Sequence, residues 1–247
     1  QMAGHSKWAN IKHKKAAQDA KRGKVFTKII KELMVAAKTG GSDPEANPRL
    51  RQAISTAKAA NMPSETISRN VQKGAGELEG VNYEELSYEG FGPEGVAIIM
   101  DVMTDNKNRT VAEIRHLMTK FGGNLGENGS VGWMFEKLGQ IIIESQSINE
   151  ENLFNDALEF GANDFAKADS DFLITSDPSL TADIAENLEK KNYNVISSKI
   201  EMVPKNIIKI DHSKSSRLLD LLEKLEEHDD VQSIASNFEL TDSNSIS

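Results

Sequence analysis

The sequence contains no cysteine, which excludes disulfide bonds, thiol nucleophiles and cysteine-ligated zinc sites. No apolar run approaches the roughly 18 residues that a membrane-spanning helix needs. The residues after Met2 carry charges where a secretory signal needs an apolar stretch. We therefore expect a cytoplasmic protein with no membrane partner.

The motifs of common enzyme sites are also missing. There is no phosphate-binding P-loop, no G-x-S-x-G and no G-x-G-x-x-G after a strand. The acidic runs EENLFNDALE and LEEHDD are typical of solvated helix faces. The histidines are scattered without an H-x-x-x-H pair, and they are His5, His13, His116, His212 and His228. We predict no enzymatic activity, no cofactor, no metal site and no small-molecule substrate.

Charge is divided unevenly along the 247 residues. Residues 1–80 hold 15 Lys and Arg against 7 Asp and Glu, a net charge of +8, whereas residues 81–247 hold 14 against 31, a net charge of −17. Within residues 1–38 alone the count is 10 against 2. Such asymmetry favours a polyanion partner for the basic part. The alternatives are a solvated basic face, a patch that docks on the acidic part of the same molecule, or an acidic partner protein.

The first third of the chain is predicted to be helical. GKVFTKIIKELMVAAKTGG has apolar residues three and four apart and ends in two glycines, and Asn47 and Ser64 are positioned to start two further helices. The basic residues off the apolar stripes are expected to face outward, and they are Arg49, Arg51, Lys58, Arg69 and Lys73. The Gly-, Glu- and Pro-rich stretch GAGELEGVNYEELSYEGFGPEG predicts a linker near residue 80.

The remaining sequence alternates strand and helix signals. GVAIIMDVM, VGWMFEK, GQIIIES and VQSIASNFEL each predict one strand, and RTVAEIRHLMTKFGG predicts a helix with a capping box from Thr110 to Glu113. Residues 139–203 show the order β-α-β-β-α-β of the ferredoxin-like motif, and the flanking pieces repeat it when they are joined. We predict an α+β protein in which a basic helical bundle (1–80) precedes two ferredoxin-like domains. The second domain (136–204) is inserted in the first (81–135 plus 205–241), and 242–247 form a disordered tail.

Two loops are candidates for contact with the phosphates of a nucleic acid. TDNKNRT offers Asn106, Asn108 and Arg109 at a predicted helix start, where free N–H groups bind phosphate, although a turn with a cap explains it equally. GGNLGENGSVGW, residues 122–133, is rich enough in glycine to approach a nucleic-acid backbone, or to form turns with positive φ.

The opening segment carries the strongest signal. Its lysines and arginines neutralise phosphates without reading base sequence, and Lys14, Lys21 and Lys28 recur every seven residues, so they share a helix face. Trp8 either stacks on an exposed base or anchors the segment on the bundle. No set of residues resembles a helix that reads bases in the major groove.

Long runs of this sequence resemble the YebC-like family. They are MAGHSKWANIKHKKAAQDAKRGKVFTKI, NPRLRQAISTAKAANMP, YEGFGPEGVA, TDNKNRTVAEIRH and GGNLGENGSVGWMFEKLG, with EMVPKN and DVQSIASNFEL extending the resemblance toward the C-terminus. The resemblance implies a basic helical domain followed by two α/β domains, and no enzymatic activity. Members are described as DNA-binding transcriptional regulators. Others are similar to ribosome-associated translation factors, among them a mitochondrial activator of cytochrome oxidase translation and bacterial factors that act on proline-rich stalls.

We therefore predict a non-enzymatic nucleic-acid-binding regulator of gene expression. A DNA-binding transcriptional regulator is the first hypothesis, and a translation factor that binds ribosomal RNA is the alternative. The candidate contacts are Lys7, Trp8, Lys12, His13, Lys14, Lys15, Lys21, Arg22, Lys24 and Lys28, with Asn106, Asn108 and Arg109 as a second group.

Overall fold

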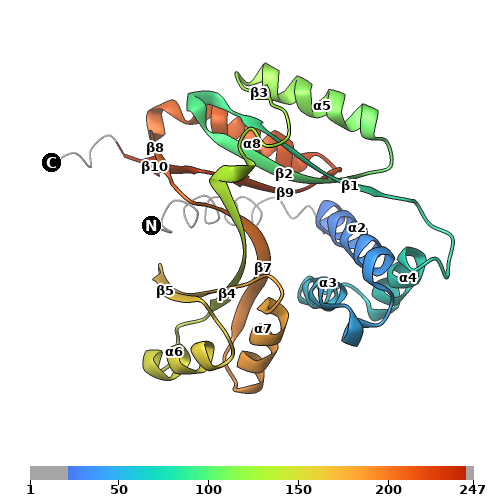
Figure 1. Cartoon of the computed structure of the whole chain (residues 1–247), viewed down its shortest axis with the longest axis vertical. Coiled ribbons are helices and arrows are strands. Elements are labelled where there is room, and N and C mark those ends of the chain that lie inside the picture. The colour runs from blue at the N-terminus through green and yellow to red at the C-terminus, as the bar shows by residue number, and fades with distance from the viewer. Residues whose placement is uncertain (1–21, 243–247) are drawn as a thin grey trace.

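A computed structural model describes residues 22–242, which form a helical unit and two mixed units of helix and sheet (Figure 1). The α+β class predicted from the sequence is confirmed. No helix within this range is long and apolar enough to cross a membrane.

The helical unit consists of three helices and one short 3-10 turn. Its core joins Leu33, Leu50, Ala57 and Ile67 with neighbouring alanines and methionine. The elements are α2 (Arg22–Gly40), η1 (Pro44–Ala46), α3 (Pro48–Ala59) and α4 (Ser64–Gly74). The predicted helix starts after Asn47 and Pro63 are confirmed, and α2 ends at the predicted glycine pair, where Gly41 has φ +92°.

Asn47 fastens the end of α2 to the start of α3. Its Oδ1 accepts from Leu50 N at 3.0 Å, which caps α3, while its Nδ2 donates to Ala36 O and Gly41 O, both at 2.8 Å. The Asn47 side chain is buried, and its bonds to Leu50 and Ala36 are buried with it, whereas the bond to Gly41 is half-buried.

Asn47→Ala is expected to lower the free energy of unfolding by about 1.5 kcal/mol, since it removes a helix cap and two donors to buried or half-buried carbonyls. Urea unfolding followed by circular dichroism measures the change. Asn149→Ala is the control, because Asn149 caps α6 (Glu150–Glu159) through a single exposed bond to Asn152 N. An equal loss in the two variants would mean that the bonds to Ala36 and Gly41 contribute nothing.

The next unit is built on a four-stranded sheet with the order β3-β1-β2-β9. Helices α8 and α5 pack on the face of this sheet to which Ile98 and its alternate neighbours in β2 point. The residues of α8 in this core are Leu218, Leu221, Leu222 and Leu225. Strands β8 and β10 form a separate parallel pair. The elements are β1 (Glu84–Phe91), η2 (Pro93–Gly95), β2 (Ala97–Thr104), α5 (Lys107–Lys120), β3 (Asn124–Leu125), β8 (Ile208–Asp211), η4 (His212–Lys214), α8 (Ser216–Glu227), β9 (Val231–Ser236) and β10 (Phe238–Thr241).

The third unit is connected to the rest of the molecule by two long strands, β4 and β7 (Figure 1). Strands β4 and β7 pair from Phe135↔Pro204 to Ile143↔Val195 and form the centre of an antiparallel sheet with the order β5-β6-β4-β7. Helices α6 and α7 cover one face over a core that includes Ile141, Leu153 and Ile184. The elements are η3 (Gly132–Met134), β4 (Phe135–Ile143), α6, β5 (Asp164–Ala168), β6 (Asp171–Ser176), α7 (Thr181–Lys190) and β7 (Val195–Pro204).

Four local predictions were wrong. Residues 84–91, assigned to a linker, form β1 and pair with the full length of β2. VGWMFEK and GQIIIES are one strand preceded by η3, and VQSIASNFEL is two strands separated at Asn237. Asn237 breaks this run because its side-chain oxygen accepts from Ala97 N while its carbonyl accepts from Ile208 N. Helix α5 starts one turn earlier than expected, so Asn106 rather than Thr110 is its cap.

Candidate nucleic-acid interface

Most of the predicted contact residues lie before the described part of the chain. They are Lys7, Trp8, Lys12, His13, Lys14, Lys15 and Lys21. Arg22 is the first residue of α2, and its side chain is outside the described set as well. These residues remain predicted contacts.

Lys24 and Lys28 lie on the face of α2 that meets α8. Lys24 Nζ donates to Glu227 O at 2.7 Å, and Lys28 Nζ donates to Glu226 O at 2.5 Å. The last carbonyls of a helix have no intrahelical partner and carry the negative end of its dipole, so they attract ammonium groups. A nucleic-acid phosphate that bound these lysines would have to share them with the α8 carbonyls.

One turn further along α2, Lys31 enters a buried cluster around Asp230. Lys31 Nζ lies 3.1 Å from Asp230 Oδ1 and also donates to Asp229 O at 2.7 Å, and both charged side chains are over 90% buried. Asp230 Oδ2 accepts from Arg109 Nη2 at 2.7 Å and from Thr110 Oγ1 at 2.8 Å. Burial alone would raise the pKa of Asp230, but hydrogen bonds from Thr110, Arg109 and Lys31 hold it below the usual value. This cluster joins the helical unit to the unit that contains α5 and β9.

Two residues of the second group of predicted contacts, Asn106 and Arg109, are linked to the same cluster. Asn106 Oδ1 accepts from Arg109 N at 3.1 Å and so occupies a backbone donor that a phosphate would need. The Arg109 guanidinium contacts Asp230, Asp105 and Glu113, and the hydrogen bond to Asp230 is the main reason that its pKa is raised. Asn108 is exposed. The geometry favours the turn-and-cap alternative for TDNKNRT, because three carboxylates surround its only arginine.

Ligand atoms of Glu113, His228 and Asp230 lie within 4.8 Å of one another, which is close enough for a metal ion. Both oxygens of Asp230 are already bonded, and the nearby Lys31 and Arg109 cations oppose a further cation. His228 Nδ1 accepts from Asp230 N, so Nε2 carries the proton that faces Glu113 Oε2 at 2.5 Å. The arrangement fits a hydrogen-bonded cluster better than a metal site.

The glycine-rich loop, residues 122–133, is packed firmly against β1. Gly122 and Gly129 have positive φ, as the turn interpretation expects. The carboxylate of Glu89, only 7% exposed, accepts from Val131 N at 3.0 Å and Gly132 N at 3.2 Å. Trp133 follows at once and is 65% exposed. Sequence reasoning noted the glycines of this loop but missed the exposed indole, which no periodic pattern marks.

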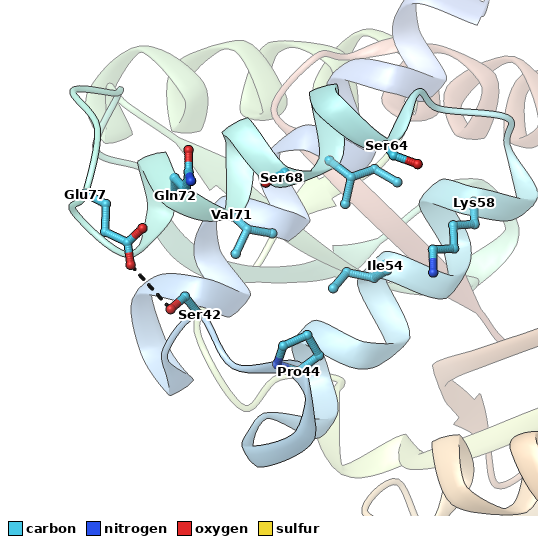
Figure 2. Close-up of a pocket in the computed structure, with 10 residues that line it drawn as sticks. Ser42, Pro44, Ile54, Lys58, Ser64, Ser68, Val71, Gln72 and Glu77 are labelled. Atoms are coloured by element: carbon cyan, nitrogen blue, oxygen red, sulfur yellow. Dashed lines mark hydrogen bonds between the residues drawn. The ribbon is translucent and has the colours of Figure 1, made fainter.

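The helical unit contains an open groove of about 450 Å³ between α3, α4 and η1 (Figure 2). Its floor is apolar, with Ile54, Ile67 and Val71, and Lys58 lies near one end. At the other end Ser42 Oγ lies 3.5 Å from Glu77 Oε1. No histidine lines the groove beside its serines.

Two of the arginines expected to face solvent instead join the units, so that prediction was wrong for them. Arg49 of α3 binds Glu32 of α2 at 2.8 Å and Glu85 of β1 at 2.6 Å, and the bond from Arg49 lowers the pKa of Glu85. Arg51 Nη2 lies 2.8 Å from Asp183 Oδ1 at the start of α7. Basic groups of the helical unit thus contact both acidic units of the same molecule. Docking within the molecule was one of the alternatives to a polyanion partner that the charge pattern left open.

Comparisons with known proteins agree with this architecture. The sequence profile of the TACO1/YebC N-terminal domain matches residues 6–77, and the profile of the TACO1/YebC second and third domain matches residues 83–238. The chain belongs to the TACO1/YebC family.

Relatives in this family share about half of the sequence. A "probable transcriptional regulatory protein" of Dictyoglomus turgidum is 51% identical over 98% of this chain and 97% of its own length, and one from Syntrophus aciditrophicus is 52% identical with the same coverage. The crystal structure of a conserved hypothetical protein, Aq1575, from Aquifex aeolicus has a TM-score of 0.81 at 43% identity and covers 93% of this chain and 95% of that one. The curated names describe TACO1/YebC relatives as regulators.

Proposed function

We propose that this TACO1/YebC protein is a non-enzymatic regulator of transcription that binds DNA through its N-terminal basic residues. The observation that carries the proposal is the excess of 10 Lys and Arg over 2 Asp and Glu within residues 1–38. The names of the curated relatives support the transcriptional role. The proposal includes a cytoplasmic location for the protein.

The contacts of α2 narrow the proposed surface. Lys24, Lys28 and Lys31 are engaged with α8 and Asp230, so they stabilise the molecule in this state. The cations nearer the N-terminus, Lys7, Lys12, Lys14, Lys15 and Lys21, are therefore the best candidates for phosphate contact. The acidic remainder of the chain would repel DNA, which confines contact to this end of the molecule.

The test is duplex DNA binding by fluorescence anisotropy as a function of salt. If about six phosphates are neutralised, the affinity of the wild type should fall on the order of 10³-fold between about 50 and 200 mM salt. Changing Lys12, Lys14 and Lys15 together to Glu should weaken binding to every duplex sequence, because phosphate contacts carry no sequence information. The salt dependence should become shallower, because fewer phosphates are neutralised.

The control reverses three lysines of equal charge outside the helical unit. Lys205, Lys209 and Lys214 are exposed, and their change to Glu alters the net charge by the same amount. Equal loss of affinity in both triple variants would attribute binding to overall charge and would reject the N-terminal site. A wild-type protein that leaves duplex DNA for ribosomes in a mixed sedimentation assay would overturn the transcriptional assignment in favour of translation.

The domain division is part of the same proposal. We assign 1–80 to a nucleic-acid-binding domain, 81–135 with 205–241 to a split α/β domain and 136–204 to an inserted one. The order β5-β6-β4-β7, with α6 and α7 on one face, supports a ferredoxin-like inserted domain. In the split domain β1 lies between β3 and β2, the inner position that β8 would occupy in a ferredoxin-like sheet. The ferredoxin-like description therefore applies to this domain only if β1 is counted in place of β8. The predicted tail, 242–247, lies beyond the described residues except for Asp242.

A further inference from the structure

Helix α6 presents two large apolar side chains to solvent. Phe154 is 41% exposed and Leu158 is 47% exposed. They are four residues apart, with Glu151 three residues before Phe154, so the three side chains form one stripe along the helix. The sequence predicted a solvated polar face here, and this stripe departs from that prediction.

The exposed phenyl ring is held in a fixed position. Phe154 meets Phe165 of β5 edge to face with 5.5 Å between ring centroids, and Phe165 stacks on Phe172 of β6 at 5.4 Å. Phe172 belongs to the core and is 4% exposed. A stripe supported from the core needs little ordering when a partner binds, which favours its use as an anchor.

The strand beside this stripe is open on its outer side. Strand β5 is the last in the order β5-β6-β4-β7, so within residues 22–242 no strand pairs with its outer edge. Phe154 packs on Phe165 of β5, so the apolar stripe adjoins the strand that carries this free edge. Figure 1 shows β5 and α6 on the side of the inserted unit that lies away from α3. An extended peptide segment can pair with a free strand edge while its side chains contact the adjoining apolar stripe. Lys167 on β5 limits nonspecific pairing at this edge, as single edge charges do.

Charge decides which class of segment fits. Residues 136–204 hold 14 Asp and Glu against 5 Lys and no Arg, a formal net charge of −9. Helix α6 alone carries Glu150, Glu151, Asp156 and Glu159 and no basic residue. Nucleic acids and anionic membranes are repelled by such a surface, and so is a second copy of the same unit.

We propose that the stripe of Phe154 and Leu158, with the adjoining edge of β5, binds a basic segment of a partner protein that also carries apolar side chains. Apolar groups of the segment cover the two exposed side chains, and its cations meet Glu150, Glu151 and Glu159. The proposal does not depend on DNA binding, because the stripe lies in a different unit from the basic N-terminus. A protein with both surfaces would join a nucleic acid to a basic protein.

The experiment compares two short fluorescent peptides, one of alternating Lys and Leu and one of alternating Lys and Ser, by anisotropy at physiological salt. Burial of two apolar side chains should make wild type prefer the Leu peptide by about tenfold or more. Phe154→Ser with Leu158→Ser should abolish this preference. Glu151→Lys should weaken the binding of both peptides, and it tests the charge contribution while leaving Phe154 and Leu158 unchanged.

Leu78→Ser is the matched control, since Leu78 is 44% exposed and lies outside the inserted unit. This variant should keep the full preference for the Leu peptide. The proposal fails if wild type shows no preference, or if the preference survives in the double serine variant, which would place peptide binding elsewhere. It also fails if sedimentation shows a dimer of wild type that the double serine variant dissolves, because a second copy would then occupy the stripe.

Discussion

Asp230→Ala is expected to lower the free energy of unfolding by about 3–5 kcal/mol, the largest loss that we predict for a single substitution. The change leaves the Lys31 ammonium buried without its carboxylate, and removing one member of a buried pair costs about this much. Arg109 and Thr110 lose their shared acceptor as well. Chemical unfolding monitored by circular dichroism measures the loss.

The neighbouring residue provides the control for this prediction. Asp229 is exposed and contacts Lys31 only through its backbone carbonyl, so Asp229→Ala should change the free energy of unfolding by no more than about 0.5 kcal/mol. Lys31→Met in the Asp230→Ala background should recover part of the lost stability, because no uncompensated ammonium remains in the interface. A small loss in Asp230→Ala, equal to that of Asp229→Ala, would show that the cluster does not stabilise the molecule.

The same carboxylate makes stability depend on pH. The pKa of Asp230 is lower in the folded protein than in the unfolded chain, so its contribution is complete above the ordinary aspartate pKa. The contribution is lost as pH falls from that value, near 4, through the lowered folded value. The difference in stability between wild type and Asp230→Ala should therefore shrink as the solution becomes more acidic.

The sequence predicted elements best where local signals determine them. Apolar spacing and the glycines at 40 and 41 predicted the C-terminal end of α2, and Asn47 predicted the start of α3. The βαββαβ order of the inserted region followed from periodicity in the same way. Strand β1 was missed because its glycine and glutamates resemble a linker, and only pairing with β2 makes it a strand. Long-range pairing has no local signature.

The candidate site shows the same division between local and long-range information. Charge counting identified the basic region, but it could not tell that Lys24, Lys28 and Lys31 bind a helix end and a carboxylate about 200 positions later in the chain. Arg109 was predicted to contact phosphate because it lies at a predicted helix start, and its bond to Asp230, 121 positions later, has no signal in the local sequence. Ion pairs between units depend on how the units dock, and a charge pattern alone contains no such information.

Gly74 shows that the packing of α4 on α2 depends on the absence of a side chain at one position. It is the last residue of α4, and a Cβ atom at this position would lie 2.2 Å from Met34 O and 2.7 Å from Met34 Cα, both backbone atoms of α2. Real Cβ atoms do not approach backbone so closely, so Gly74→Ala must push α4 away from α2. The sequence identified Gly74 as a helix stop, but the structure adds this close approach, which a stop signal does not predict.

Gly74→Ala is expected to lower the free energy of unfolding by about 2 kcal/mol. Overpacking at a rigid contact costs about 3 kcal/mol, and the better helix propensity of alanine offsets up to about 1 kcal/mol. Gly23→Ala is the matched control, because Gly23 is also helical and no atom of the described residues 22–242 lies within 4 Å of a Cβ placed there. That variant should be as stable as wild type or slightly more stable. If both alanine variants gained stability in urea unfolding, α4 would tolerate displacement, and close packing of α4 on α2 would not be what holds the helical unit together.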